Sequence, residues 1–140
     1  MHSPDAQYFL DKDYQLDYRP IANAQDLLRL SNDFMQEEKK YEGIWAREVL
    51  RFLDYDQLYR IISHYLSLLK SYGTLFCSFR YGQSNKRSQD GMVLLDMTEG
   101  KLKQLLVKLD YDIHFKHWLN RYETPNEIQN WFNVQITKLD

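Results

Sequence analysis

The order of apolar segments in the middle of the chain limits its fold more than any other feature. Between Asp54 and Gly73, apolar residues recur at spacings of three and four, at Leu58, Ile61, Ile62, Tyr65, Leu66 and Leu69. This spacing predicts an amphipathic helix, which Asp54 and Gln57 begin as a capping box and Gly73 closes. Short apolar runs flank this helix at Gly43–Ala46 and Thr74–Phe79. Such runs on either side of a helix are typical of a parallel βαβ unit that is buried on both faces.

A second helix and two further strands follow. Leucines recur at helical spacing from near Thr98 to near Asp110, which predicts another amphipathic helix. Beyond it, Tyr111–Phe115 and Trp131–Thr137 alternate apolar and polar residues, as half-buried strands do. Only a loop around Thr124–Asn126 separates the two strands. They are therefore expected to pair as an antiparallel ribbon at a sheet edge.

These elements fit one domain over residues 1–140. A chain of 140 residues, 44% of them hydrophobic, is long enough for a single core. The expected fold is α/β, with a mostly parallel sheet, a C-terminal antiparallel strand pair and helices on both faces. The first 40 residues are less regular: they predict a short helix at Asp5–Leu10 and only weak strands at Tyr14–Tyr18 and Leu28–Ser31.

The composition argues against several classes of function. A net charge of −2 without a long basic stretch gives no support for nucleic-acid binding. No segment resembles a transmembrane helix or a signal peptide, and a single cysteine cannot form an internal disulfide. We therefore expect a cytoplasmic protein that has no membrane partner.

Residues that often carry chemistry are few. His114 and His117 lie three apart on a predicted strand, which places them on opposite faces and argues against a metal site. Cys77 lies inside an apolar strand, where it is expected to be a small buried hydrophobic residue rather than a nucleophile. The sequence shows no Ser/His/Asp or Cys/His arrangement, so no catalytic residue is assigned.

Several segments carry motifs in a recognisable order. They are Tyr41–Ala46 (YEGIWA), Leu68–Leu75 (LLKSYGTL), Phe79–Gly82 (FRYG), Asp90–Gly91 with Asp96–Glu99 (DMTE), and Trp131–Val134 (WFNV). They resemble the motifs YDGIWA, LLKPGGxL, FKYG, RDG with TDMTEE, and WLNV of small bacterial class I S-adenosylmethionine-dependent methyltransferases. The resemblance spans about residues 41–138. It implies a Rossmann-like methyltransferase fold that is truncated at its N-terminus, with residues 1–40 degenerate.

The N-terminal part resembles the family only in fragments. Asp5–Leu10 and Tyr14–Gln15 resemble the helix and second strand that follow the family's glycine-rich cofactor loop, DLGCGSG, but the loop itself has no counterpart here. Glycine is needed in that loop because a side chain would block the backbone's approach to the cofactor. The acidic residue that holds the ribose hydroxyls would fall near Pro20, although Asp17 is only three positions away. We therefore expect no cofactor to bind.

The resemblance also supplies candidate site residues. If cofactor binding survives, Asp33 and Phe34 correspond to the turn that contacts the adenine, and Arg47 adjoins the cofactor at the end of the next strand. The carboxyl ends of parallel strands line the cleft of such folds, which makes Glu48, Arg80 and Tyr81 candidates for a substrate or partner cleft. The plainer alternative is that these are ordinary residues of a strand end and a helix start.

Three functions follow from this reading. The first is a degenerate methyltransferase-like pseudoenzyme, a non-catalytic binding or regulatory module that acts in a complex. Without the glycine-loop strand, the strand at Gly43–Ala46 has an open edge, which a homodimer or another protein partner is expected to cover. The second is an active S-adenosylmethionine-dependent methyltransferase whose N-terminal strand and loop come from another chain or from upstream sequence. The third is an inert remnant.

Overall fold

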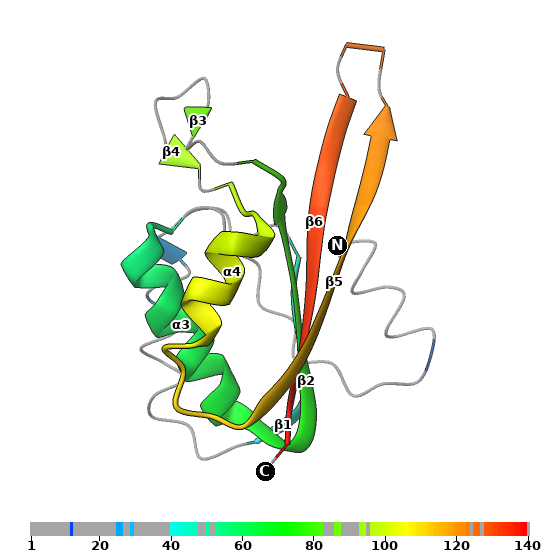
Figure 1. Cartoon of the computed structure of the whole chain (residues 1–140). Coiled ribbons are helices and arrows are strands. Elements are labelled where there is room, and N and C mark those ends of the chain that lie inside the picture. The colour runs from blue at the N-terminus through cyan, green and yellow to red at the C-terminus, as the bar shows by residue number, and fades with distance from the viewer. Residues whose placement is uncertain are drawn as a thin grey trace.

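The described residues form a four-stranded sheet with helices α3 and α4 against one face (Figure 1). The computed structural model describes residues 40–47, 50, 53–82, 86–87, 93–94, 96–123, 125–126 and 128–139, together with residues 12, 25–26 and 29. Its elements are β1 (Tyr41–Arg47), α3 (Tyr55–Leu68), β2 (Leu69–Arg80), β3 (Lys86–Arg87), β4 (Val93–Leu94), α4 (Glu99–Leu106), β5 (Ile113–Glu123) and β6 (Ile128–Lys138). The predicted α/β class and the order of the main elements are confirmed.

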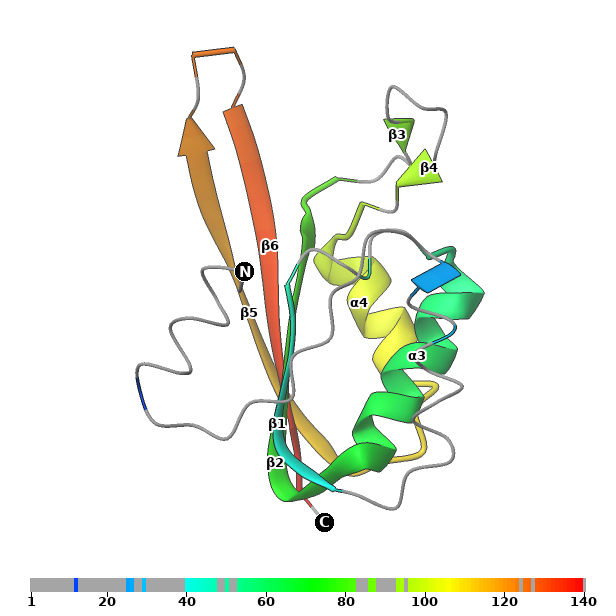
Figure 2. The same cartoon turned by 180° about the vertical axis from the view of Figure 1, so that it is seen from behind.

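The sheet is mixed rather than mostly parallel. Its strand order is β1-β2-β6-β5, and β3 and β4 form a separate small ribbon. Strands β1 and β2 are parallel, as predicted for a βαβ unit, whereas β6 is antiparallel to both β2 and β5. The two views of the molecule show α3 and α4 on the same side of the sheet (Figures 1 and 2). Among the described residues no helix covers the other side, so helices on both faces are not confirmed.

Helix α3 begins as its sequence predicts but ends earlier. The Asp54 side chain accepts from the Gln57 amide at 2.8 Å, and the Gln57 side chain accepts from the Asp54 amide at 3.0 Å, which completes the capping box. The helix ends at Leu68, with Leu69 as its C-cap. Gly73 was expected to close the helix, but it lies within β2 instead.

A tight turn joins α3 to the sheet. The register between β1 and β2 shifts between Tyr41 and Gly43, so that residues 70–73 form an irregular segment beside Glu42. Tyr72 has a φ of 64°, a left-handed conformation that costs a residue with a Cβ atom about 1–2 kcal/mol. A Cβ atom on Gly73 would lie 2.9 Å from the Lys70 carbonyl oxygen. The turn therefore accommodates Gly73 easily and Tyr72 only with strain.

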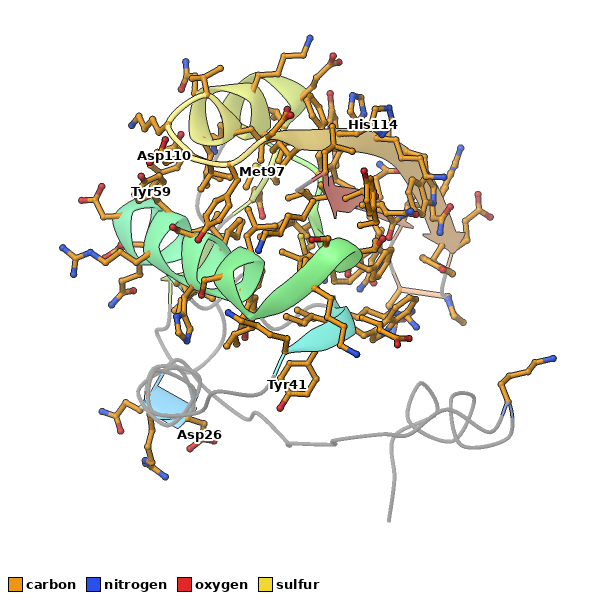
Figure 3. All side chains as sticks on the ribbon, turned by 90° about the horizontal axis from the view of Figure 1, so that it is seen from below. Asp26, Tyr41, Tyr59, Met97, Asp110 and His114 are labelled. Carbon is orange, nitrogen blue, oxygen red and sulfur yellow. The ribbon has the colours of Figure 1, made fainter. Side chains whose placement is uncertain are left out.

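The core lies between the helices and one face of the sheet. Alternate residues of the two central strands face the helices and are fully or almost fully buried: Leu75, Cys77 and Phe79 from β2, and Phe132, Val134 and Ile136 from β6. Helices α3 and α4 cover them with Leu58, Ile62, Leu66, Leu102 and Leu105. Tyr59 on α3 reaches the turn after α4, where its hydroxyl donates to the Lys108 carbonyl at 3.0 Å (Figure 3).

Helix α4 is shorter than its leucine pattern predicts. It begins after Thr98, whose hydroxyl accepts from the Lys101 amide at 3.2 Å, and it ends at Leu106 rather than near Asp110. An ion pair of 2.9 Å between Lys103 and Glu99 ties its first two turns together. His117 of β5 lies 3.5 Å from the same Glu99 carboxylate, which links the helix to the edge strand.

The C-terminal ribbon is confirmed and is longer than expected. Strands β5 and β6 pair antiparallel from Ile113 with Lys138 to Glu123 with Ile128. The pairing of β6 with β2 stops at Trp131, so the end of the hairpin projects beyond the rest of the sheet (Figure 1). The loop predicted near residues 124–126 lies at this end, where Pro125 and Asn126 are bends.

The predictions for the first 40 residues fall largely outside the described residues. This applies to the helix at residues 5–10 and to the weak strand at residues 14–18. Gln25, Asp26 and Arg29 are helical, so the weak strand predicted from residue 28 to residue 31 is not confirmed.

Replacing the core leucines should destabilise the fold strongly. Leu66 and Leu106 are buried against the sheet, and we expect alanine at either position to lower the free energy of unfolding by about 2–5 kcal/mol. Val107 is the matched control, because it follows Leu106 directly but is 81% exposed. Chemical denaturation should show a change below about 0.5 kcal/mol for Val107→Ala. Equal effects at Leu106 and Val107 would mean that the buried face of α4 is assigned wrongly.

The turn at the start of β2 gives a second test of stability. Tyr72→Gly should raise the free energy of unfolding by about 1 kcal/mol, because glycine adopts the left-handed conformation without strain and the Tyr72 side chain is 73% exposed. Gly73→Ala should lower it, since the new methyl group meets the Lys70 carbonyl. Urea denaturation of both variants tests the pair. A loss of stability in Tyr72→Gly would contradict the account of the turn.

Candidate functional site

Two of the predicted site residues lie on the same face of the sheet. Arg47 is the last residue of β1 and is opposite Ser78 on β2, while Arg80 is the last residue of β2. Because residues two apart on a strand share a face, Ser78 and Arg80 project to the side that α3 and α4 leave uncovered. Arg47 is in the same cross-strand row as Ser78, so both arginines lie on this side. We call this side the open face.

Tyr81 lies apart from the two arginines. Its backbone amide donates to the Asn130 carbonyl at 2.9 Å, and its ring centroid lies 6.1 Å from that of Phe132, a residue of the core. The backbone after β2 then pairs with Met97, through a parallel bridge at Tyr81. Three other candidates, Asp33, Phe34 and Glu48, lie outside the described residues. The structure therefore brings Arg47 and Arg80 to one face, and it does not test the rest of the predicted cleft.

Strand direction creates a groove on the open face. Each of the four strands carries an aromatic residue followed two positions later by a polar one, at Trp45 and Arg47, Phe76 and Ser78, Trp118 and Asn120, and Trp131 and Asn133. Strand β6 runs antiparallel to its two neighbours, so Asn133 lies opposite Ser78 and Trp118. Trp131 lies opposite Arg80 and Asn120, on the far side of Asn133 from Phe76. The polar residues are thereby enclosed between two aromatic groups.

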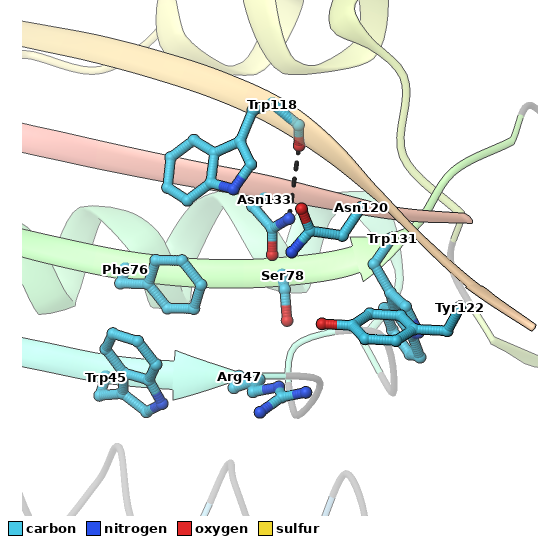
Figure 4. Close-up of a pocket in the computed structure, with 9 residues that line it drawn as sticks. All are labelled: Trp45, Arg47, Phe76, Ser78, Trp118, Asn120, Tyr122, Trp131 and Asn133. Atoms are coloured by element: carbon cyan, nitrogen blue, oxygen red, sulfur yellow. Dashed lines mark hydrogen bonds between the residues drawn. The ribbon is translucent and has the colours of Figure 1, made fainter. Parts of the chain in front are cut away.

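The resulting groove has a volume of about 220 Å³. Its lining comprises Trp45, Arg47, Phe76, Ser78, Trp118, Asn120, Tyr122, Trp131 and Asn133 (Figure 4). Trp45 stacks on Phe76 with ring centroids 4.0 Å apart, and the Phe76 centroid is 6.0 Å from that of Trp118. These three rings form one wall. Trp131 and Tyr122 form the other wall, with the Tyr122 hydroxyl directed toward the centre of the groove.

A row of hydrogen-bonding groups crosses the floor between the walls. The register places Arg47 opposite Ser78, and Ser78 opposite Asn133. The Asn133 amide nitrogen donates to the Trp118 carbonyl at 3.4 Å, which leaves its amide oxygen directed toward Ser78 (Figure 4). Asn120 adds a second amide from β5. Ser78 and Asn133 are themselves buried, so the floor is polar although it lies within the sheet.

This groove is not among the sites predicted from the sequence, although the sequence contains a signal for it. Thr74–Phe79 was predicted to be a strand buried on both faces, and the predicted site residues lie at strand ends and in the turn at Asp33 and Phe34. The repeated pattern of an aromatic residue and a polar residue two positions apart, present in four strands, was the available signal. A site inside the face of a sheet depends on the register between strands, which one strand's pattern does not contain.

The described part of the chain places Cys77 and the two histidines of β5 as the sequence predicts. Cys77 is fully buried, and its burial raises the pKa of the thiol to about 12, which disfavours the reactive thiolate. His114 and His117 lie on opposite faces of β5, as predicted. No cluster of metal-binding side chains is found in the part of the chain that the structure describes. No helix among the described residues is long and apolar enough to cross a membrane.

Comparison with known proteins confirms the type of fold. No protein-family model matches the chain, and no curated protein matches it significantly in sequence. Among solved structures, it is similar to the 1,6-didemethyltoxoflavin-N1-methyltransferase of Burkholderia thailandensis, with a TM-score of 0.70 and 15% identity over 98% of this chain and 67% of that enzyme. That enzyme was solved with 1,6-didemethyltoxoflavin and S-adenosylhomocysteine bound.

Two further solved methyltransferases support the same type of fold. A SAM-dependent methyltransferase of Methanosarcina mazei matches with a TM-score of 0.56 and 16% identity, over 76% of this chain and 64% of its own. The N-methyltransferase NodS of Bradyrhizobium japonicum, solved with S-adenosyl-L-homocysteine, matches with a TM-score of 0.52 and 14% identity, over 77% and 52%. The chain has a class I methyltransferase-like fold and spans between half and two thirds of these three enzymes.

The buried thiol leads to a simple test. At pH 8 the native protein should not react with iodoacetamide, because Cys77 is inaccessible and its pKa of about 12 keeps it protonated. The same sample unfolded in guanidinium chloride should be alkylated once, which serves as the control. Mass spectrometry measures both results. Rapid alkylation of the folded protein would contradict this placement of β2.

Proposed function

We propose that this chain is a non-catalytic methyltransferase-like binding module that acts in a complex. Among the described strands β1 lies at one edge of the four-stranded sheet, and this position is the observation that supports the proposal. An edge strand presents a row of backbone donors and acceptors to which a strand of another chain can pair. Strand β1 contributes seven residues to that edge, enough for such pairing.

The sequence before β1 explains why we expect no cofactor to bind to the chain alone. A glycine-rich loop holds a dinucleotide-like cofactor through backbone N–H groups that a side chain would obstruct. In the 140 residues the first glycine is Gly43, which already belongs to β1. Residues 1–42 therefore offer no glycine for such a loop, which supports a role that needs no cofactor.

The alternative function is an active S-adenosylmethionine-dependent methyltransferase. The similarity to a methyltransferase across 98% of this chain favours it. In that case the N-terminal strand and glycine loop come from another chain or from upstream sequence. Asp33, Phe34 and Arg47 would then contact the cofactor, and Glu48, Arg80 and Tyr81 would line the substrate cleft. Both functions require a second polypeptide segment at the edge of β1, and cofactor binding separates them.

Calorimetry with S-adenosylmethionine distinguishes the two functions. Titration of the purified 140-residue chain should give no saturable heat at micromolar cofactor. S-adenosylhomocysteine, the ligand of several similar structures, serves as a second probe. Saturable binding of either compound would reject the non-catalytic module and favour the methyltransferase.

The state of the β1 edge gives the second test. Light scattering after size exclusion should show a dimer whose fraction rises with concentration, or a pull-down from the native host should recover one stable partner protein. In that assembly every amide of Tyr41–Arg47 should be protected from hydrogen exchange, because strands on both sides accept its hydrogen bonds. A monomer at all concentrations that recovers no partner would contradict the proposal and favour an inert remnant.

A further inference from the structure

The outer edge of β5 is long and regular. The strand runs over eleven residues, Ile113–Glu123, and pairs with β6 along its whole length without a register shift (Figure 1). It contains neither proline nor glycine, and β6 is its one partner strand in the described part of the chain. Edge strands that stay unpaired are usually short, or are blocked by proline, by bulges or by charges. The edge of β5 lacks the first three features, so its charges decide whether it can pair.

The backbone groups that point away from β6 belong to alternate residues of β5. The Leu139 amide donates to the Asp112 carbonyl at 2.9 Å, which identifies these opposite residues as a hydrogen-bonded pair. Because such pairs alternate along an antiparallel ladder, the even-numbered residues of β5 bond to β6. The Asn133 amide nitrogen donates to the Trp118 carbonyl at 3.4 Å, which agrees, since that carbonyl also points toward β6. The N–H and C=O groups of the odd-numbered residues therefore form the outer edge.

A second copy of β5 fits this edge over its full length. Two identical strands that pair antiparallel are related by a two-fold axis. When this axis passes through Trp118, the middle residue of the strand, every residue of one β5 lies opposite a residue of the other. Odd-numbered residues then meet odd-numbered residues, so that outward-pointing groups face each other. The two strands would exchange about twelve backbone hydrogen bonds, within the range of a typical protein interface.

Large exposed side chains surround the axis. Trp118 is 38% exposed, and the next residue, Leu119, is 54% exposed on the other face of the strand. Opposite residues that do not exchange hydrogen bonds are the closer ones in an antiparallel pair, so the two Trp118 rings would be in contact. Pairing of two β5 strands would therefore remove apolar surface from water on both faces of the joined sheet.

The charges on β5 permit this pairing. With the axis at Trp118, each Lys, Arg or Glu side chain of one strand lies opposite an uncharged residue of the other: Lys116 opposite Asn120, Arg121 opposite Phe115, and Glu123 opposite Ile113. Like charges directly opposite each other would destabilise the pair, and this register contains none. A shift of two residues would place Arg121 opposite His117 and would leave Ile113 unpaired. Charge and strand length therefore favour the same register.

We propose that β5 pairs antiparallel with β5 of a second copy of this chain, across a two-fold axis at Trp118. The pairing joins the two four-stranded sheets into one continuous sheet. Strand β1 lies at the opposite edge, so this dimer leaves it available for the complex described under the proposed function. The inference depends on the residues of β5 and not on what pairs with β1.

Disulfide trapping tests the register. Lys116 and Asn120 are both exposed on the open face and would lie directly opposite each other across the axis, with Cα atoms about 4.5 Å apart. A disulfide joins Cα atoms that are roughly 4.4–6.8 Å apart. A mixture of Lys116→Cys chains and Asn120→Cys chains should therefore form a disulfide-linked dimer under mild oxidation. Each variant alone is the matched control, because its two new cysteines would be about 14 Å apart. The native Cys77 does not interfere, since it is fully buried.

Light scattering after size exclusion measures the strength of the dimer. The native chain should dimerise with a dissociation constant below about 100 μM. Trp118→Lys should weaken the dimer by about tenfold or more, because it places two like charges at the axis. Ile128→Lys is the matched control: Ile128 is an exposed apolar residue of the same hairpin but belongs to β6, so the dimer should be unchanged. Circular dichroism checks that each variant is folded.

Three results would overturn the proposal. The first is a native chain that is monomeric at all concentrations up to about 100 μM. The second is a dimer that folded Trp118→Lys leaves unchanged. The third is a mixture of the two cysteine variants that forms no linked dimer, or no more than each variant forms alone.

Hydrogen exchange distinguishes this interface from pairing at β1. In the β5 dimer the amides of Phe115, His117 and Leu119 should become protected as the concentration rises, because their outward N–H groups gain acceptors. Pairing at β1 would protect Tyr41–Arg47 instead. Protection of β1 without protection of these β5 amides would reject the β5 dimer and support the proposed function. Protection of the β5 amides supports the β5 dimer, whatever happens at β1.

Discussion

The pairing of β6 along both of its edges is the interaction on which the rest of the structure depends. Strand β6 hydrogen-bonds to β2 on one side and to β5 on the other, antiparallel in both cases. It joins the βαβ unit of β1, α3 and β2 to the C-terminal ribbon. Consecutive residues from Trp131 to Val134 are buried, although alternate ones point to opposite faces. This strand therefore belongs at once to the core and to the floor of the groove.

The two faces of the sheet serve different purposes because their residues differ in kind. On the helix side, Val134 and Ile136 complete an apolar core with α3 and α4, and the buried Cys77 belongs to it. On the other side, Trp131 and Asn133 belong to a row of aromatic and polar side chains that no described helix covers. Burial of the first face stabilises the fold, and the second carries the aromatic and polar side chains of the candidate site. Strand β6 thus contributes residues both to the stabilising core and to the candidate site.

Local sequence predicted the elements better than their arrangement. The capping box at Asp54 and Gln57 and the alternation in the last two strands depend on near neighbours, and the structure confirms both. The end of α3 was misplaced because Gly73 looks like a helix terminator. It lies instead at the start of β2, where the Lys70 and Glu42 carbonyl oxygens leave little room for a Cβ atom. The groove was missed because it arises from the register between strands, which no single segment determines.

The cross-strand register of β6 is the most direct test of this account. If β6 were shifted by one residue, Trp131 and Asn133 would turn toward the helices, and neither the core nor the groove would exist as described. Nuclear Overhauser effects between backbone protons measure this register in solution. The account predicts contacts of Asn133 with both Ser78 and Trp118, its partners on the two sides. Contacts of Phe132 or Val134 with Ser78 and Trp118 in place of Asn133 would contradict it.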